Sequence, residues 1–175
     1  MISFWSPTHP NAYLGQWHES DFALTSDIVE QGLPDAIRNL KLYQERKETL
    51  CKVCGEFTTA EKFMMVMKAA IFADEESLAK MRATHDPKTL KALGRGVANF
   101  DHATWQRYSL DIVIVGNYLK FTQNAQLRAE LIKTGDKILV EGSPVEYTDA
   151  LFCSFASTHT HSQKHTTAAQ YGAWV

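Results

Sequence analysis

The feature that most constrains the fold is a succession of helix starts through the middle of the chain. Between residues 58 and 135, apolar side chains recur at helical spacing, and residue types that cap helices precede these runs. Thr58-Thr59-Ala60-Glu61 fits a capping box and predicts a helix to about Phe72. Asp74, Asp86 and Asp101 precede three further runs, and the run after Asp101 is the longest. The centre of the domain is therefore predicted to be helical.

The flanking segments predict short strands and turns. Apolar pieces punctuated by proline and glycine occupy residues 1–25, and a short strand is expected near Val53–Phe57. Residues 137–141 form the clearest strand in the sequence. A single helix is expected to begin at Pro34-Asp35. We therefore predict a helix-dominated α+β fold, compact and with a few short strands.

The charge balance argues against a protein that holds nucleic acid by bulk charge. Lysine and arginine total 18 and aspartate and glutamate total 20, for a net charge of −2, whereas such domains are usually strongly basic. A local site in which a few cationic side chains bind one phosphate remains possible. The start of the chain lacks the basic-then-apolar order of a secretory signal, and no apolar run approaches the roughly 20 residues that span a bilayer. These features indicate a cytosolic or nuclear compartment; we expect a cytoplasmic location and a small-molecule partner, with no membrane association.

Two segments raise the question of a metal. Cys51-Lys52-Val53-Cys54 is a single C-x-x-C, and Cys153, the third cysteine, lies far along the chain. A structural zinc site needs four ligands, so we expect no metal. Residues 153–175 are rich in serine, threonine and histidine without any sustained periodicity, which predicts a disordered tail.

Helical spacing brings a carboxylate and an ammonium together. Glu61, Met65 and Lys68 share one face of the predicted helix, where they could serve a polar ligand with hydroxyl and phosphate groups. The structural alternative is that Glu61 is the third helical residue of the capping box. Trp105 presents a similar choice, because an aromatic side chain in the first turn of a helix can stack on a flat heterocycle or pack in the core.

Further candidates lie where helices and strands end. Arg95 stands between two glycines and offers a fork for phosphate, although a glycine there can also simply end a helix. Asn117 and Lys120 lie near the end of the longest helix, with polar groups that could bind a ligand. Glu141 and Glu146 follow the last predicted strand, at the kind of position where catalytic carboxylates are common.

Taken together, these segments resemble the NADAR family, the YbiA-like group that includes riboflavin-intermediate N-glycosidases. No single piece is diagnostic, but five pieces occur in the family's order over about residues 58–148. They are Thr59-Ala60-Glu61-Lys62-Phe63-Met64-Met65 with Lys68-Ala69, Asp86-Pro87 with Lys91-Ala92-Leu93-Gly94-Arg95, Phe100-Asp101 with Trp105, Gly116-Asn117 with Lys120-Phe121-Thr122-Gln123-Asn124, and Thr134-Gly135-Asp136 with Leu139-Val140-Glu141-Gly142-Ser143-Pro144. Tyr13-Leu14-Gly15-Gln16-Trp17 is a weaker match to the family's opening segment.

The resemblance implies hydrolysis of an N-glycosidic bond, with ribose phosphate or ADP-ribose released from a base. It makes Glu61 the leading catalytic residue and Glu146 a second carboxyl, where the family normally has aspartate. Trp105 is implied to stack on the base, with Asn117 among the substrate-binding residues. The remaining expectation is that cations hold the phosphate: Lys68, Arg95 and Lys120. No cofactor is implied, and the oligomeric state stays open.

The sequence departs from the family after residue 148. The family reads Trp-Gly-x-Gly where this chain has Asp149-Ala150-Leu151-Phe152. We therefore expect a NADAR domain over residues 1–152, with an insertion at about 26–57 and a divergent tail at 153–175. Two alternatives to an active N-glycosidase remain: a non-catalytic module that binds ADP-ribose or a nucleotide, and an inactive, truncated family member. An ADP-ribosylated nucleic acid is a further possible partner.

Overall fold

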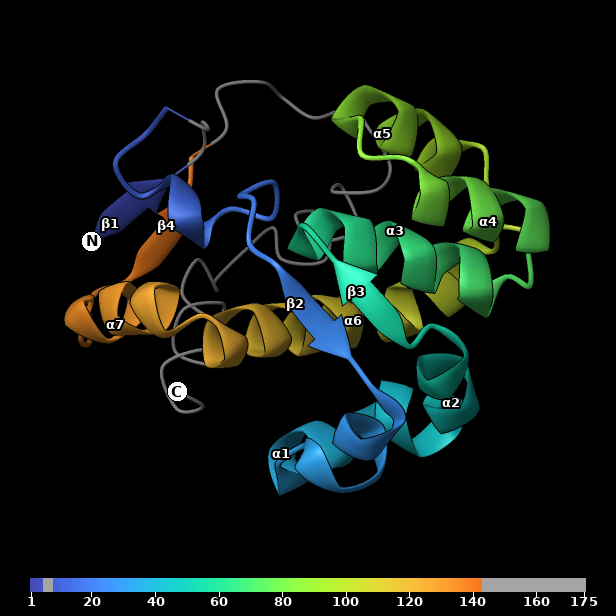
Figure 1. The fold of residues 1–175 in the computed structure, drawn as a ribbon, viewed down its shortest axis with the longest axis horizontal. Helices are drawn as coiled ribbons and strands as arrows, with labels where there is room; N and C mark the ends of the chain where they lie inside the picture. The colour runs from blue at the N-terminus through green and yellow to red at the C-terminus, as the bar shows by residue number, and fades with distance from the viewer. Residues whose placement is uncertain (5–7, 143–175) are drawn as a thin grey trace.

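The computed structural model describes residues 1–4 and 8–142, and this part of the chain is dominated by helices (Figure 1). The helices are a 3-10 turn η1 (Ala12–Leu14), a π-helical segment η2 (Ile28–Gly32), α1 (Asp35–Arg38), α2 (Lys41–Lys52), α3 (Ala60–Ile71), α4 (Glu75–Ala83), α5 (Pro87–Arg95), α6 (His102–Gln123) and α7 (Ala125–Lys133). The strands are β1 (Ile2–Phe4), β2 (Phe22–Leu24), β3 (Gly55–Phe57) and β4 (Leu139–Glu141). The predicted helix-dominated α+β class is confirmed.

Local capping explains where the central helices begin. Asp74, Asp86 and Asp101 each accept a hydrogen bond from the backbone N–H three residues later, at 3.0, 2.8 and 2.7 Å. These contacts satisfy N–H groups that have no partner within their own helix. The predicted starts of α4, α5 and α6 are thus confirmed, and the physical reason is contained within four consecutive residues.

The segment between residues 26 and 54 differs from the prediction. The helix start expected at Pro34-Asp35 is confirmed, since α1 begins at Asp35. Its continuation as a single helix is wrong, because the chain leaves helical geometry at Leu40, whose ψ is 146°, and α2 starts at the next residue. Leu40 supplies no side-chain cap; instead the carboxylate of Asp111 in α6 accepts the N–H of Leu42 at 2.9 Å. A cap from a different helix leaves no local signal in the sequence.

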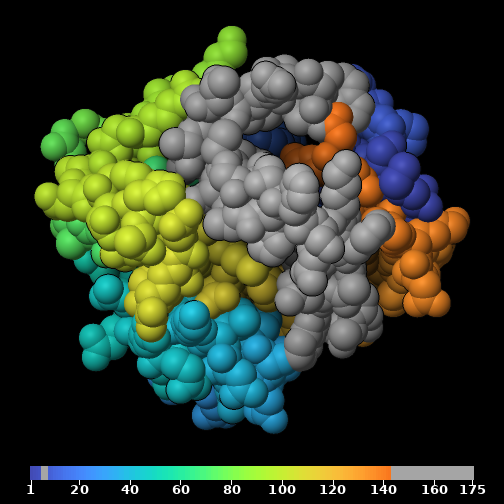
Figure 2. Space-filling view, turned by 180° about the vertical axis from the view of Figure 1, so that it is seen from behind, coloured from blue at the N-terminus to red at the C-terminus, as the bar shows by residue number. Residues whose placement is uncertain are grey.

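The strands form two short pairs. β2 and β3 are antiparallel, with Phe22 opposite Phe57, and β1 and β4 are parallel, with Ile2 opposite Leu139. The second pair places the start of the chain next to the last strand described, as the blue and orange ribbons in Figure 1 show. From behind, these blue and orange segments lie on the side of the molecule opposite the green helices α4 and α5 (Figure 2).

Helix α3 is the centre of the core. Every residue from Ala60 to Ala70 is buried, and α3 packs against α2, α4, α5 and α6. The helices approach closely at Gly116 of α6, where a Cβ would lie 2.8 Å from the ring of Phe63. Phe63 also packs edge-on against Phe57. Among the helices described, none is both long and apolar enough to cross a membrane.

Candidate functional site

Glu61 lies in the first turn of α3, buried to 6% exposure. The capping-box interpretation of this residue is wrong: Thr59 is the N-cap, and its hydroxyl accepts the N–H of Lys62 at 3.0 Å. Glu61 is therefore the second helical residue, and its own N–H donates to the carbonyl of Gln16 at 3.0 Å. Within residues 1–4 and 8–142, no hydrogen bond or ion pair reaches its carboxylate. The structural role that competed with catalysis is thereby removed.

The pKa of Glu61 is raised to about 7, and burial is the largest cause of this rise. The negative charge of Glu141 contributes to the rise, and the positive charge of Lys91 opposes both effects. Glu141 is the last residue of β4; it retains solvent exposure, but the surrounding protein still raises its pKa. The structure therefore brings two carboxyls into electrostatic contact, Glu61 and Glu141. Glu146, the second carboxyl implied by the family resemblance, lies outside the described residues.

Lys68 and Met65 lie on the face of α3 that meets α5, as helical spacing predicts. The ammonium of Lys68 donates to the carbonyl of Gly94 at 2.6 Å, and burial lowers its pKa to about 8. A Cβ at Gly94 would lie only 2.2 Å from the sulfur of Met65, so only glycine lets the two helices approach this closely. Glu61 belongs to the same face, because the charge of Lys91 on α5 acts on it.

Trp105 is a core residue, only 1% exposed. Lys68 Nζ lies 5.4 Å from the centre of its ring and 4.3 Å from that of Phe100, within the range of a cation–π interaction. The indole N–H is buried, and no partner for it is found in the described chain. Stacking of Trp105 on a base stays a prediction. In this structure the indole ring packs in the core, and its N–H is a buried donor without a partner among the described residues.

Asn117 and Lys120 lie near the C-terminal end of α6. Asn117 Nδ2 donates to the carbonyl of Val113, while the side-chain oxygen of Asn117 is buried without a partner among the described residues. Lys120 has 0% exposure, and its ammonium donates to the carbonyls of Tyr13 and Gly15 at 2.7 and 2.8 Å. Lys120 thus anchors the segment that leads into Gln16; one of its three N–H donors remains for the predicted contact with phosphate, but the side chain is fully buried.

Two residues near the site were not singled out from the sequence. The side-chain oxygen of Gln16 is buried and unpaired in the described structure, like that of Asn117. Lys91 acts electrostatically on Glu61, whereas Arg95, the predicted phosphate ligand of the same helix, is exposed at its C-terminal end. The signal for both missed residues was present, since each lies inside a segment that resembles the family.

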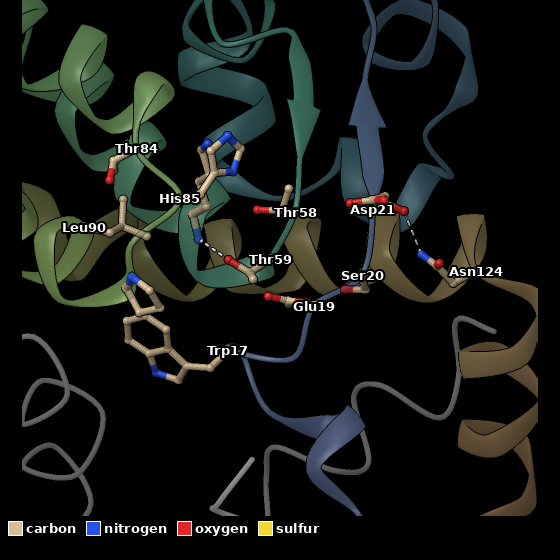
Figure 3. A pocket seen from close by; sticks show the side chains of 12 residues that line it. Trp17, Glu19, Ser20, Asp21, Thr58, Thr59, Thr84, His85, Leu90 and Asn124 are labelled. Atoms are coloured by element: carbon tan, nitrogen blue, oxygen red, sulfur yellow. Dashed lines mark hydrogen bonds between the residues drawn. The ribbon is translucent and has the colours of Figure 1, made fainter. Parts of the chain in front are cut away.

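A groove of about 500 Å³ opens on the other side of the first turn of α3 (Figure 3). Trp17, 37% exposed, lies at one side of it, and Asn124 Nδ2 donates to the carbonyl of Asp21 at the other. Its lining residues come from the segment before β2, the start of α3, the α4–α5 connection and the end of α6: Trp17, Glu19, Ser20, Asp21, Thr58, Thr59, Lys62, Thr84, His85, Pro87, Leu90 and Asn124. The groove is wide enough for a nucleotide-sized ligand.

The described residues hold no group of three or more histidine, cysteine, aspartate or glutamate side chains that could bind a metal ion. Cys51 and Cys54 are both free thiols. The histidine-containing tail, residues 153–175, lies outside the described part of the chain, so its predicted disorder stays a prediction. What the described site offers chemically is a buried carboxyl with a pKa of about 7.

Comparison with known proteins agrees with this chemistry. The model of the NADAR domain matches residues 3–168. A protein named as an N-glycosidase in Acanthamoeba polyphaga mimivirus is 42% identical over 90 residues, which cover 51% of this chain and 53% of that protein. An N-glycosidase of Nostoc punctiforme is 29% identical over 90 residues, 51% of this chain and 58% of the relative. Protein irg-1 of Caenorhabditis elegans is 30% identical over 112 residues, 63% of this chain and 51% of the relative.

This chain matches little more than half the length of each of these relatives. The family match, by contrast, covers most of the chain, and it includes the helix that carries Glu61, the α5 segment and β4. The resemblance seen in the sequence is therefore confirmed: the chain belongs to the NADAR domain family.

Proposed function

We propose that this protein is an N-glycosidase that hydrolyses the bond between a phosphorylated ribose and a nitrogenous base. The observation that carries the proposal is Glu61, a buried carboxyl with a pKa of about 7 and no hydrogen-bond partner among the described residues. A group that titrates near the working pH is suited to general acid–base catalysis. The names of the mimivirus and Nostoc relatives support the same reaction class.

In the proposed mechanism, the ionised form of Glu61 acts near the anomeric carbon. Cleavage of the bond leaves positive charge on the ribose ring, and a carboxylate in a water-poor site stabilises that charge strongly. Glu61 then accepts a proton from the water that attacks the anomeric carbon, while the second carboxyl, Glu146, assists departure of the base. Glu141 serves as a positioning residue that keeps the pKa of Glu61 high, which makes Glu61 a stronger base.

Substrate binding is proposed to use the unpaired polar atoms. Buried polar groups normally have partners, so the exceptions at Gln16, Trp105 and Asn117 suggest atoms that bond to a ligand. Phosphate is proposed to bind the cations implied by the family: Lys68, Arg95 and Lys120. The substrate classes that fit are a phosphorylated ribosylamino-pyrimidine of riboflavin synthesis and an ADP-ribosylated base, including one within nucleic acid.

The experiment is a release assay with one substrate of each class, measuring free ribose 5-phosphate or ADP-ribose. Removal of a general base typically slows a reaction by about 10²–10⁴-fold, so Glu61→Gln should lose activity by that order while it keeps the folded circular-dichroism spectrum. Glu56→Gln is the matched control, because Glu56 is an exposed glutamate of β3. Wild-type turnover that survives Glu61→Gln would disprove the role of Glu61.

The same assay separates this function from a binding module. ADP-ribose binding in calorimetry without turnover of either substrate class would favour a non-catalytic module. Absence of both binding and turnover would favour an inactive family member.

The pH dependence tests the direction of proton transfer. If ionised Glu61 is the base, kcat/KM rises with pH and levels off above a pKa near 7. Glu141→Gln should move this limb to lower pH, since removal of a neighbouring negative charge makes Glu61 easier to ionise. An activity that instead falls through pH 7 would assign the acid role to Glu61. If the rise of kcat/KM with pH has the same midpoint in Glu141→Gln as in the wild type, the coupling of the two carboxyls is refuted.

A further inference from the structure

The two described cysteines lie together in a tight turn, away from the site above. Cys51 is in the last turn of α2, and Cys54 follows directly before β3. The N–H of Cys54 donates to the carbonyl of Cys51 at 3.2 Å. A turn closed by a hydrogen bond between residues three apart keeps their Cα atoms within about 7 Å. Disulfides usually join Cα atoms about 4.4–6.8 Å apart, so the backbone here is already close to a disulfide geometry.

The sulfur of Cys54 lies against the end of α2, the helix that carries Cys51. Cys54 Sγ donates to the carbonyl of Leu50 at 3.7 Å, which keeps it over the last turn of α2, and accepts from the hydroxyl of Ser26 at 3.9 Å. The charge of Cys54 acts on Cys51, and burial raises the pKa of the Cys51 thiol. Both residues are half-buried and therefore reachable by a small reagent.

We propose that Cys51 and Cys54 form a reversible intramolecular disulfide when the protein meets a peroxide or a small-molecule disulfide. With hydrogen peroxide, the Cys54 thiolate attacks one oxygen, which gives a sulfenic acid and releases hydroxide. The Cys51 sulfur then attacks the Cys54 sulfur and expels the oxygen as a second water. In total the two thiols lose two protons and two electrons, and the peroxide is reduced to two water molecules.

Cys54 is assigned the first step because of its surroundings. Burial disfavours the thiolate of Cys51, and the hydroxyl of Ser26 donates to the sulfur of Cys54 at 3.9 Å. The turn is also tied to the helices around it, because the carbonyl of Cys54 accepts from Arg82 and the carbonyl of Arg82 accepts from Lys62. These contacts fix the backbone of the turn, and the short span between the two cysteines favours closure within the chain over reaction with a second chain.

The test uses the full chain with Cys153→Ser, which removes the remaining cysteine. The protein is treated with a slight excess of hydrogen peroxide, or with oxidised glutathione, and then alkylated with iodoacetamide. The expected result is a mass lower by two hydrogen atoms, both thiols protected from alkylation, and full recovery with dithiothreitol. The yield should not depend on protein concentration, because the reaction is intramolecular.

Three results would overturn the proposal. They are two thiols that still alkylate after oxidation, a stable mixed disulfide with glutathione, and a covalent dimer as the main product. The matched variant Cys54→Ser should leave Cys51 open to alkylation under the same conditions. This inference does not depend on the proposed N-glycosidase activity, so either can fail without the other.

Discussion

The replacement of Glu61 by glutamine should make the protein more stable at alkaline pH while it abolishes the proposed activity. Burial holds the folded-state pKa of Glu61 at about 7, against an ordinary value of 4.5. Between these two values the folded protein binds a proton that the unfolded chain has already released, so stability falls as the pH rises. This loss of stability is absent below the ordinary pKa and complete above the pKa of the folded state. Glutamine carries no charge at any pH, so the Glu61→Gln variant does not lose stability in this way.

The structure sets the size of the effect. A rise from 4.5 to about 7, at about 1.4 kcal/mol for each pH unit, corresponds to about 3 kcal/mol when it is complete. The stability advantage of Glu61→Gln over the wild type should therefore grow by about 2–3 kcal/mol between about pH 5 and about pH 8.5. For a chain of this length, the same difference moves the melting temperature by about 5–10 °C.

The measurement is urea unfolding of both proteins at several pH values across this window, with the free energies of unfolding compared at each. Effects of titrating groups that do not interact with Glu61 act on both proteins and cancel in the difference, whereas the coupled group Glu141 contributes to it. Glu56→Gln serves as the control for the same chemical change at an exposed glutamate. A pH-independent difference for Glu61→Gln would show that burial does not hold its proton, and would remove the argument for its catalytic role.

Three further substitutions test the packing around the site. Gly94→Ala should destabilise the fold by about 1–3 kcal/mol, because its Cβ would lie 2.2 Å from Met65 Sδ; a double-mutant cycle with Met65→Ala should show that the two losses do not add. Asp111→Ala should lower the free energy of unfolding in urea by about 1–2 kcal/mol, because the cap on Leu42 is lost. Asp111→Asn keeps an acceptor oxygen, so an equally large loss in that variant would contradict the capping role. Lys120→Met should lower the melting temperature, since two carbonyls lose a donor at about 1–3 kcal/mol each; an unchanged melting temperature would show that these bonds add no net stability.

The starts of the central helices could be predicted because their causes are local. An aspartate and the N–H three residues after it determine where α4, α5 and α6 begin, and these residues are neighbours in the chain. The shared face of Glu61 and Lys68 follows from helical periodicity in the same way. Where the local signal was ambiguous, as between Thr58 and Thr59, the prediction placed the cap one residue early and gave Glu61 a role that it does not have.

By itself, then, the sequence determined the helix-dominated class, the helix starts and, through ordered motifs, the NADAR family. Only the tertiary structure decided what the charged side chains do. It buries the carboxyl of Glu61, brings the charge of Glu141 to it, gives Lys68 the carbonyl of Gly94, and gives Lys120 the carbonyls of a segment over a hundred residues away. Desolvation and long-range hydrogen bonds depend on which residues packing brings together, and no spacing within one segment encodes that.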